Sequence, residues 1–269
     1  MDAYSEYRGL RQLPRPYRVL FDNDPHPGGS VDRLLWESMV RLCPATAERL
    51  YTEFTPTQVL YRPGMRPELE RVVRALGLAE RTEEERVAAV ARFASELAPR
   101  WPPPLGERKF GGSEEEIVRR GSDWCTDVAR VACGLSQVAG LPSRLVILED
   151  IERAYSGHTI VETWRGGKWG AVDVTRNEVY RTEDRVPASA WDLMTQPELL
   201  GARPDGDADA DSRRGQFSWV AIANYPLGPL EAVDYSVGAI NQYYRTILTM
   251  SEQGWPGGLR WLFGEDHTH

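Results

Sequence analysis

Two apolar runs joined by a Gly-Gly pair constrain the fold of this chain more than any other feature. His158–Trp164 and Trp169–Val174 are rich in the β-branched and aromatic residues that favour strands. Gly166 and Gly167 stand between them and suit a two-residue turn. The sequence therefore predicts an antiparallel hairpin.

The turn also sets a trial register for this hairpin. If Arg165 pairs with Lys168, then Ile160 lies opposite Asp173. Side chains alternate along a strand, so His158 lies diagonally from Asp173 on the same face, within reach of a hydrogen bond. The register therefore predicts contact between an imidazole and a carboxylate.

A helix is predicted upstream of the hairpin, from Trp124 to Ala139. Its apolar residues recur at helical spacing, and Gly140 follows its last residue. With Ser122 or Asp123 as the N-cap, Cys125 would lie in the first turn. Unpaired backbone N–H groups and the helix dipole lower the pKa of a thiol there, so Cys125 is a candidate nucleophile.

The residues between the helix and the hairpin connect the candidate groups. Ser143–Leu148 is predicted to form a buried strand, and the polar segment 149–157 leads from it to His158. Asp173 would hold one nitrogen of the imidazole and leave the other for Cys125. This is the arrangement of nucleophile, base and orienting acid used in acyl transfer.

Four features of order and spacing occur together: a cysteine at the start of a helix that is followed by Gly-Leu-Pro-Ser-Arg144, His158 four residues before Glu162, the Gly-Gly turn, and Trp169 four residues before Asp173. In these features residues 80 to 180 resemble the transglutaminase-like superfamily of papain-related enzymes. The resemblance implies that Cys125 is the nucleophile, His158 the general base and Asp173 the orienting acid. It also implies an α+β, papain-like fold with helices packed on an antiparallel sheet, and chemistry without a metal or organic cofactor.

The sequence departs from the pattern of this family at two places. Ser-Asp-Trp124 precedes the cysteine where many members have Gly-x, and Thr159 stands where an aromatic residue often follows the histidine. An upstream tryptophan donates a hydrogen bond to the oxyanion in some relatives. Trp124 and Trp101 are therefore the two candidates for an oxyanion or substrate-binding role.

The other two cysteines are predicted to be structural. Cys133 follows Cys125 by eight residues in the same helix, and Cys43 stands in Arg-Leu-Cys-Pro at a predicted helix end. Neither has a basic partner nearby in the sequence. Three cysteines without regular spacing favour a reducing compartment, and the N-terminus lacks the pattern of a signal peptide, so we expect a cytoplasmic protein.

Composition narrows the classes of partner. The chain has 269 residues, of which 41% are hydrophobic, and carries a formal net charge of -8. This charge argues against nonspecific nucleic-acid binding, and no apolar run reaches the length of a membrane span. The Asp-rich segment 205–211 lacks the glycine and glutamate of a calcium-binding loop, so we expect no metal there. The expected partner is a peptide, amide or acyl-thioester substrate; oligomeric state stays open.

The chain divides into four expected segments: an N-terminal helical region at 1–80, a catalytic core at 81–200, an acidic loop at 201–214, and an aromatic-rich extension of the same domain at 215–269. Further elements follow from capping and periodicity: helices over Ser30–Leu42, Pro67–Leu76 and Thr82–Leu97, a short helix capped by Ser113, a strand over Phe217–Ala223 and a helical stripe over Val237–Ile247.

These observations predict an enzyme that acts through a thioester on Cys125. We expect hydrolysis of an amide or peptide bond. An acyltransferase or amide synthase of the transglutaminase kind uses the same acyl-enzyme and is the alternative. A non-catalytic binding module is a second alternative, which loss of any residue of the triad would have favoured.

Overall fold

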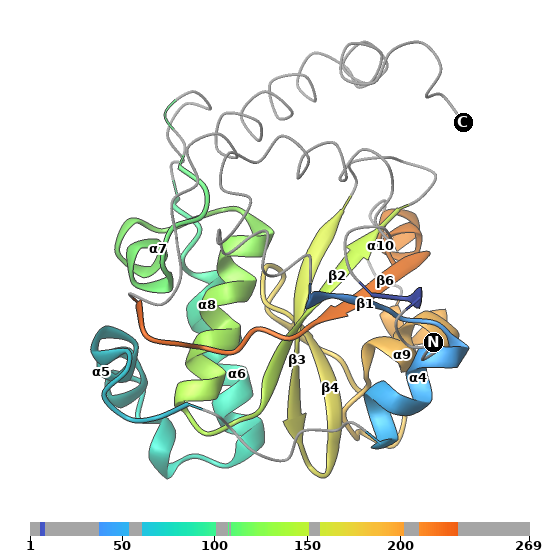
Figure 1. Ribbon diagram of the computed structural model, residues 1–269, viewed down its shortest axis with the longest axis horizontal. Helices are drawn as coiled ribbons and strands as arrows, with labels where there is room; N and C mark the ends of the chain where they lie inside the picture. Colours follow the sequence, from blue (N-terminus) through green and yellow to red (C-terminus); the bar gives the residue numbers. More distant parts are fainter. Residues whose placement is uncertain are drawn as a thin grey trace.

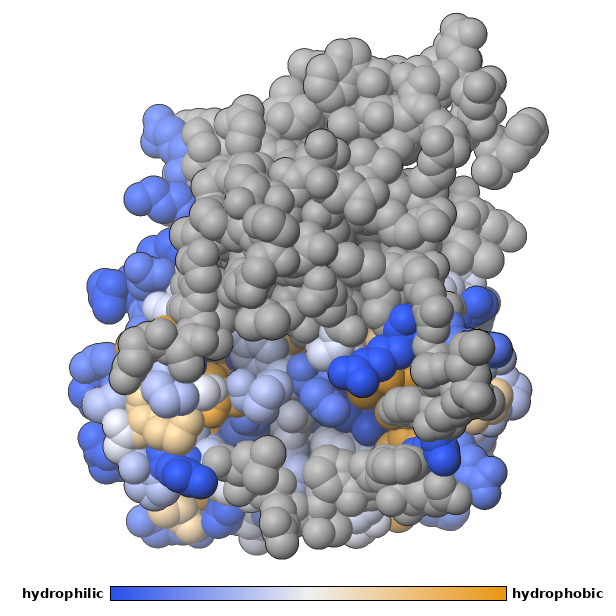
Figure 2. Space-filling model, in the orientation of Figure 1, coloured by the Kyte–Doolittle hydropathy of each residue, from blue (hydrophilic) through white to orange (hydrophobic). Residues whose placement is uncertain are grey.

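The computed structural model describes residues 6–8, 38–53, 61–100, 107, 109–150, 157–201 and 210–230. In this part of the chain, helices cover both faces of one six-stranded antiparallel sheet, so the fold is α+β (Figure 1). Hydrophilic residues cover most of the described surface in the view of Figure 2.

Each neighbouring pair of strands in this sheet is antiparallel. In sheet order the strands are β1 (Val40–Arg41), β6 (Trp219–Ala223), β2 (Ser143–Glu149), β3 (His158–Arg165), β4 (Lys168–Asp173) and β5 (Glu178–Val179). The sheet thus takes strands from the N-terminal region, the expected core and the C-terminal extension. The strands predicted over 143–148 and 217–223 are confirmed as β2 and β6.

The predicted hairpin and its register are confirmed. Arg165 pairs with Lys168, and the same register continues to Val161 and Val172. Gly166 and Gly167 have φ values of 57° and 80°, the positive angles that a type I′ turn needs at both central positions. β4 therefore ends beside the start of β3.

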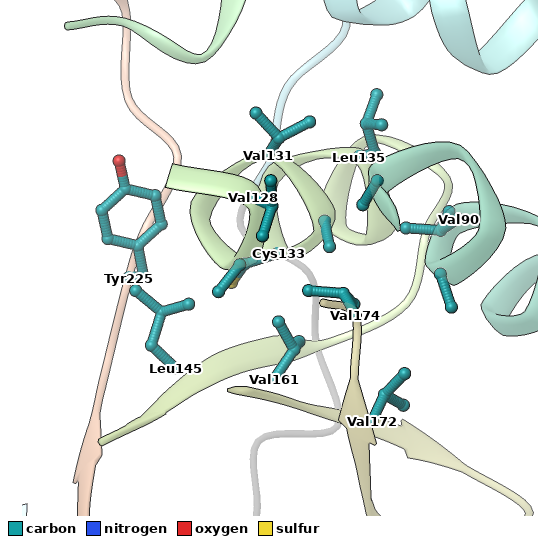
Figure 3. Packing of buried hydrophobic residues seen from close by; sticks show 14 of the residues in the cluster. Val90, Val128, Val131, Cys133, Leu135, Leu145, Val161, Val172, Val174 and Tyr225 are labelled. Carbon is teal, nitrogen blue, oxygen red and sulfur yellow. The ribbon is translucent and has the colours of Figure 1, made fainter. Parts of the chain in front are cut away.

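One face of the sheet carries the longer helices. They are α5 (Pro67–Ala75), α6 (Glu83–Ser95), α7 (Glu114–Arg120) and α8 (Cys125–Val138), with a 3₁₀ turn at Leu78–Glu80. α8 packs directly on β2 and β3 (Figure 1). Figure 3 shows Val128 and Cys133 of α8 directed toward Leu145 and Val161 of the sheet, in the larger of two hydrophobic clusters.

Predicted capping residues begin two of these helices. The Thr82 hydroxyl accepts from the backbone N–H of Glu85, whose carboxylate accepts from the Thr82 N–H, and Ser113 and Glu116 repeat the arrangement. Each reciprocal pair satisfies two N–H groups that the helix cannot satisfy itself. α5, α6 and α7 confirm the helices predicted in this region.

Short helices cover the other face of the sheet. They are α4 (Pro44–Glu48), a π-helical turn at Arg49–Glu53, α9 (Ala190–Thr195), a 3₁₀ turn at Pro197–Leu200 and α10 (Ala210–Gln216). Leu50 and Leu193 from these segments pack with Val146 and Ile160 of the sheet in the second hydrophobic cluster. Alternation along β3 therefore sends Ile160 to one cluster and Val161 to the other.

The end of the helix predicted over 30–42 is wrong. Val40 and Arg41 form β1, where they pair with Ile222 and Ala221 of β6. The backbone groups of this edge strand are satisfied by a partner about 180 residues away, which local periodicity does not reveal. Residues 30–37 lie outside the described residues.

The predicted acidic loop is partly helical. α10 begins at Ala210, so the last residues of the segment 201–214 form a helix rather than a loop. Arg213 near its C-terminal end is buried and pairs with Glu178 of β5 at 3.4 Å, an interaction that anchors the helix to the sheet. Residues 202–209 and the predicted stripe 237–247 lie outside the described residues.

Candidate active site

Cys125 is the first residue of α8, and its backbone position follows from the loop before it. The N-cap is Trp124, so the prediction of Ser122 or Asp123 as N-cap is wrong. The Ser122 hydroxyl accepts from the Trp124 N–H at 3.1 Å and donates to Asp127 at 2.9 Å. Its hydrogen bonds therefore stabilise the loop rather than cap the helix. Asp123 is exposed.

The preceding turn is anchored to the end of α6. The Ser122 N–H donates to the carbonyl of Leu97 at 3.0 Å. Gly121 has a φ of 77°, and a Cβ there would lie 2.6 Å from that carbonyl oxygen, so the position requires glycine. The chain therefore enters α8 along one fixed path.

Asp127 ties the first turn of α8 to two loop segments. Its carboxylate accepts from the backbone N–H of Gly111 at 2.9 Å and from Arg120 at 2.8 Å, besides Ser122. Burial raises the pKa of Asp127, and the charges of Arg130 and Arg120 oppose that rise. This buried group fastens the segment on which Cys125 sits.

The structure brings Cys125, His158 and Asp173 together. The Nε2 atom of His158 lies 2.9 Å from Oδ2 of Asp173, as the hairpin register predicted. The imidazole and the Cys125 thiol are also close enough to shift each other's pKa, the thiol's downward and the imidazole's upward. Because Asp173 engages Nε2, Nδ1 is the ring nitrogen available to the sulfur. Cys125 is half-buried, whereas His158 and Asp173 are buried.

The three groups shift one another's pKa values. Burial acts to raise the pKa of the Cys125 thiol, but the effects of His158, of the Thr159 backbone N–H and of Thr126 together outweigh burial and lower the pKa below its usual value. Burial acts to lower the pKa of His158, yet Asp173 and Cys125 raise it to about 10. The pKa of Asp173 is lowered to about 2 against the effect of burial, chiefly by His158. The arrangement favours a thiolate beside an imidazolium.

Arg176 is a functional candidate that our sequence analysis missed. Its guanidinium lies 2.6 Å from Oδ2 of Asp173, and its backbone N–H donates to Oδ1 at 3.1 Å. The carboxylate is thus held by His158 and by its own turn. The sequence could have indicated this contact, because Arg176 follows Asp173 by three residues at the end of a strand. An aspartate at the start of a turn commonly accepts hydrogen bonds from the residues that follow it.

Of the two tryptophans predicted to bind the oxyanion, the structure describes only Trp124. Trp124 is half-buried, adjoins Cys125 in the chain and packs edge-on against Phe110, with ring centroids 5.1 Å apart. Trp101 lies outside the described residues. A further donor is the backbone N–H of Cys125, which as the first helical residue has no acceptor within α8.

The other cysteines lie in different surroundings. Cys133 is fully buried in the core, and burial raises its pKa to about 12. Cys43 caps α4, with its sulfur 3.6 Å from the Thr46 hydroxyl. All three cysteines of the chain are free thiols.

Three further residues of the sequence pattern form a separate buried cluster. Arg144 and Glu162 face each other across β2 and β3 with charged atoms 2.7 Å apart, and the Arg144 guanidinium lies 4.0 Å from the centre of the Trp169 ring. Tyr51 donates to Glu162 at 2.9 Å. These residues join the strands to the short helices on the face of the sheet opposite α8, so their role here is structural.

No group of three His, Cys, Asp or Glu side chains in the described ranges could hold a metal ion. None of the helices described reaches the length and hydropathy that a membrane crossing needs. Comparison with family models, curated proteins and solved structures found no match to this chain.

Proposed function

We propose that this protein is a cysteine-dependent acyl-transfer enzyme that hydrolyses an amide or peptide bond through a thioester on Cys125. The observation that carries the proposal is the 2.9 Å contact between His158 Nε2 and Asp173, on an imidazole that also acts to lower the pKa of the thiol at the start of α8. This combination supplies a nucleophile, a proton carrier and an orienting acid.

Acylation follows from the resting ion pair. The Cys125 thiolate attacks the carbonyl carbon, and an electron pair moves onto the carbonyl oxygen. When the tetrahedral intermediate collapses, the C–N bond breaks and His158 gives its Nδ1 proton to the leaving nitrogen. The amine departs, and the acyl group stays on sulfur as a thioester. Asp173 keeps the ring oriented throughout this transfer.

Deacylation returns the pair to its starting state. Neutral His158 accepts a proton at Nδ1 from water, and the water oxygen attacks the thioester carbonyl. The C–S bond breaks, the acid leaves, and thiolate and imidazolium form again. Cys125 is half-buried rather than sealed, which supports access of water and therefore hydrolysis.

The negative oxygen of the tetrahedral intermediate needs hydrogen-bond donors. The Cys125 backbone N–H is one candidate, because it lies at the positive end of the α8 dipole. The indole N–H of Trp124 or of Trp101 is a second. Replacement of Trp124 by Phe would keep the packing on Phe110 while removing the indole donor, and a loss in kcat of about a hundredfold would assign it this role.

The family assignment belongs to the same proposal. The order of Cys125, His158 and Asp173, the helix before the strands and the antiparallel sheet support a transglutaminase-like, papain-related core. The steps above require no cofactor. Cysteine chemistry of this kind needs a reduced thiol, which agrees with the expected cytoplasmic location.

The first experiment asks whether an acyl-enzyme forms. The protein would be mixed with a library of acyl-thioesters and short peptidyl anilides, and its intact mass and tryptic peptides would be measured. We expect an added acyl mass on the peptide containing Cys125, and none in Cys125→Ala. If neither adduct nor turnover appears with any member of the library, while ligands still bind, the non-catalytic binding module replaces the enzyme.

The second experiment asks how the thioester is resolved. Hydroxylamine or a primary amine at millimolar concentration would be added during turnover, and acid and amide products would be quantified. A hydrolase makes mainly acid under these conditions, because water is the natural acceptor. If acid is negligible without amine and amide accumulates with it, the enzyme is an acyltransferase of the transglutaminase kind.

A further inference from the structure

Two buried threonines directly follow the nucleophile and the base in the chain. Thr126 comes after Cys125 in the first turn of α8, and Thr159 comes after His158 at the start of β3. Their hydroxyl oxygens lie 3.0 Å apart, although 33 residues separate them in the sequence. This hydrogen bond thus joins the two elements that carry the reacting groups.

The pair lies at one end of the interface between α8 and the sheet. Thr159 pairs with Ile147 of β2 and shares its face of β3 with Val161, both of which belong to the cluster beneath α8. Thr126 is 8% exposed and Thr159 is 4% exposed, so water does not satisfy the two hydroxyls freely. Elsewhere in this interface the helix presents valine, for example Val128. Two valines would fill the same volume without the cost of burying hydroxyl groups.

The two hydroxyl hydrogens of the threonine pair can each donate one hydrogen bond. One hydroxyl donates to the other, and the accepting hydroxyl keeps a hydrogen of its own to donate. Thr126 and the Thr159 backbone N–H both act to lower the pKa of the Cys125 thiol, as groups that donate to the sulfur would. The consistent orientation has Thr159 donating to Thr126, and Thr126 donating to the sulfur.

We propose that Thr126 and Thr159 form a positioning pair that holds the nucleophile helix in register with the strand of the base and donates a hydroxyl hydrogen to the Cys125 thiolate. The proposal rests on the proposed function, because it assumes that Cys125 works as a thiolate. It adds a donor chain in which the Thr159 hydroxyl acts only through the Thr126 hydroxyl, and each link of a buried chain polarises the next.

The test measures the rate at which Cys125 reacts with iodoacetamide between pH 5 and pH 9, by mass spectrometry of the labelled peptide. It needs no substrate. Thr126→Val should move the midpoint of this profile to higher pH and slow the reaction below the midpoint about tenfold, since a hydrogen bond to a charged sulfur is lost. Thr159→Val should slow it about threefold, because the Thr126 hydroxyl remains but is no longer polarised.

The double variant separates a chain from two independent contacts. If Thr159 acts through Thr126, then Thr126→Val combined with Thr159→Val loses no more than Thr126→Val alone. If the rate losses of the two single variants instead multiply in the double variant, the two threonines act independently and the donor chain is ruled out. Thr126→Ser restores the hydroxyl and should react nearly as the natural protein does, whereas failure to rescue would show that the threonine contributes only packing.

Thr46→Val serves as the matched control. Thr46 is a fully buried threonine of α4, on the other face of the sheet, and its hydroxyl donates to the Arg41 carbonyl at 2.7 Å. Its replacement also removes the hydroxyl of a buried threonine, far from the candidate site, and should leave the Cys125 profile unchanged. Urea unfolding of each variant confirms that the fold is intact. Should Thr126→Val not fold, Thr159→Val compared with Thr159→Ser carries the test.

The outcomes separate the two proposals. A natural protein whose Cys125 reacts no faster at low pH than an unfolded thiol would overturn the proposed function, and the threonine pair with it. A fast, low-midpoint reaction that Thr126→Val leaves unchanged would overturn only the positioning pair.

Discussion

Helix α8 carries two cysteines in opposite chemical states, one in its first turn and one in its middle. Cys125 is half-buried beside His158, which lowers the pKa of its thiol despite the opposing effect of burial. Cys133, eight residues further along, is fully buried among aliphatic side chains, and burial raises its pKa to about 12. Its hydrogen-bond partners include Gln137, a neutral amide at 3.4 Å.

The contrast teaches that the helix alone does not activate a thiol. Burial pushes the pKa of both cysteines upward. The first turn of α8 adds unpaired N–H groups, and His158 makes the largest of the contributions that together outweigh burial at Cys125. At Cys133 the charge that acts on the thiol is that of Glu114, which raises its pKa further. Reactivity in this protein should therefore depend on the groups that orient and charge the imidazole.

The largest expected effect comes from removing those groups. His158→Ala leaves Cys125 with burial and without its cation, so the thiol pKa rises and turnover falls about 10⁴-fold or more. Asp173→Asn should cost on the order of 10⁴-fold in kcat with the fold intact, because the ring loses its orienting carboxylate. Steady-state rates with the substrate found in the library measure both, and full activity in either variant would mean that the triad is misassigned.

The pH dependence should show both members of the ion pair. The rate constant kcat/KM should rise with pH through the lowered pKa of Cys125, below 9, and fall through the raised pKa of His158, at about 10. In Asp173→Asn the alkaline limb should move to lower pH, since the carboxylate that raises the pKa of His158 is gone. If the alkaline limb does not move, Asp173 does not raise the pKa of His158 in the working enzyme.

The same pKa shift of His158 has a consequence for stability. His158 has a raised pKa in the folded state, so its contribution is fully present below about 6.5 and is lost as pH rises through about 10. Urea unfolding across this range should show a decline that His158→Ala reduces.

A smaller effect is expected from the residue that clamps Asp173. Arg176→Met removes a charged hydrogen bond of 2.6 Å, while the Arg176 backbone N–H still reaches the carboxylate. We expect kcat to fall about tenfold with KM nearly unchanged, because the carboxylate orients the imidazole less firmly. Arg181→Met removes a partly exposed arginine that pairs with Glu84, and it should leave kcat unchanged. Equal losses in both variants would point to a general charge effect.

The smallest effect is expected at the other thiol. Cys133→Ala should lower the free energy of unfolding by about 1 kcal/mol, because it removes one buried sulfur from a packed interface. Turnover should stay at the level of the natural protein. Urea unfolding and steady-state rates measure the two quantities, and a large loss of turnover without a loss of stability would contradict the contrast between the two thiols.

Local features of the sequence predicted much of the sheet and of the site. The Gly166-Gly167 turn fixed the register of its own hairpin, and that register brought His158 to Asp173. The capping boxes at Thr82 and Ser113 likewise depend only on residues three positions apart. In each of these structures the residues that interact are only a few positions apart, so a local sequence pattern is enough to predict the structure.

Long-range partners explain what the sequence did not predict. Val40 lies in an apolar stripe of helical spacing, but its backbone pairs with Ile222 near the other end of the described chain. Ser122 has the side chain of an N-cap, yet Asp127 and Trp124 use its hydroxyl within the loop. In both cases a tertiary hydrogen bond replaced the structure that local preference favoured.

Competitive labelling of the three cysteines in one native sample tests the central claim most directly. Brief exposure to iodoacetamide at pH 7, followed by peptide mapping, compares Cys125, Cys43 and Cys133 under identical conditions. At a pKa of about 12, on the order of 10⁻⁵ of Cys133 would be thiolate, and the core also shields it. We predict that Cys125 is labelled first, Cys43 more slowly, and Cys133 only after unfolding. If Cys43 or Cys133 is labelled before Cys125, the ion pair with His158 does not exist and the account is contradicted.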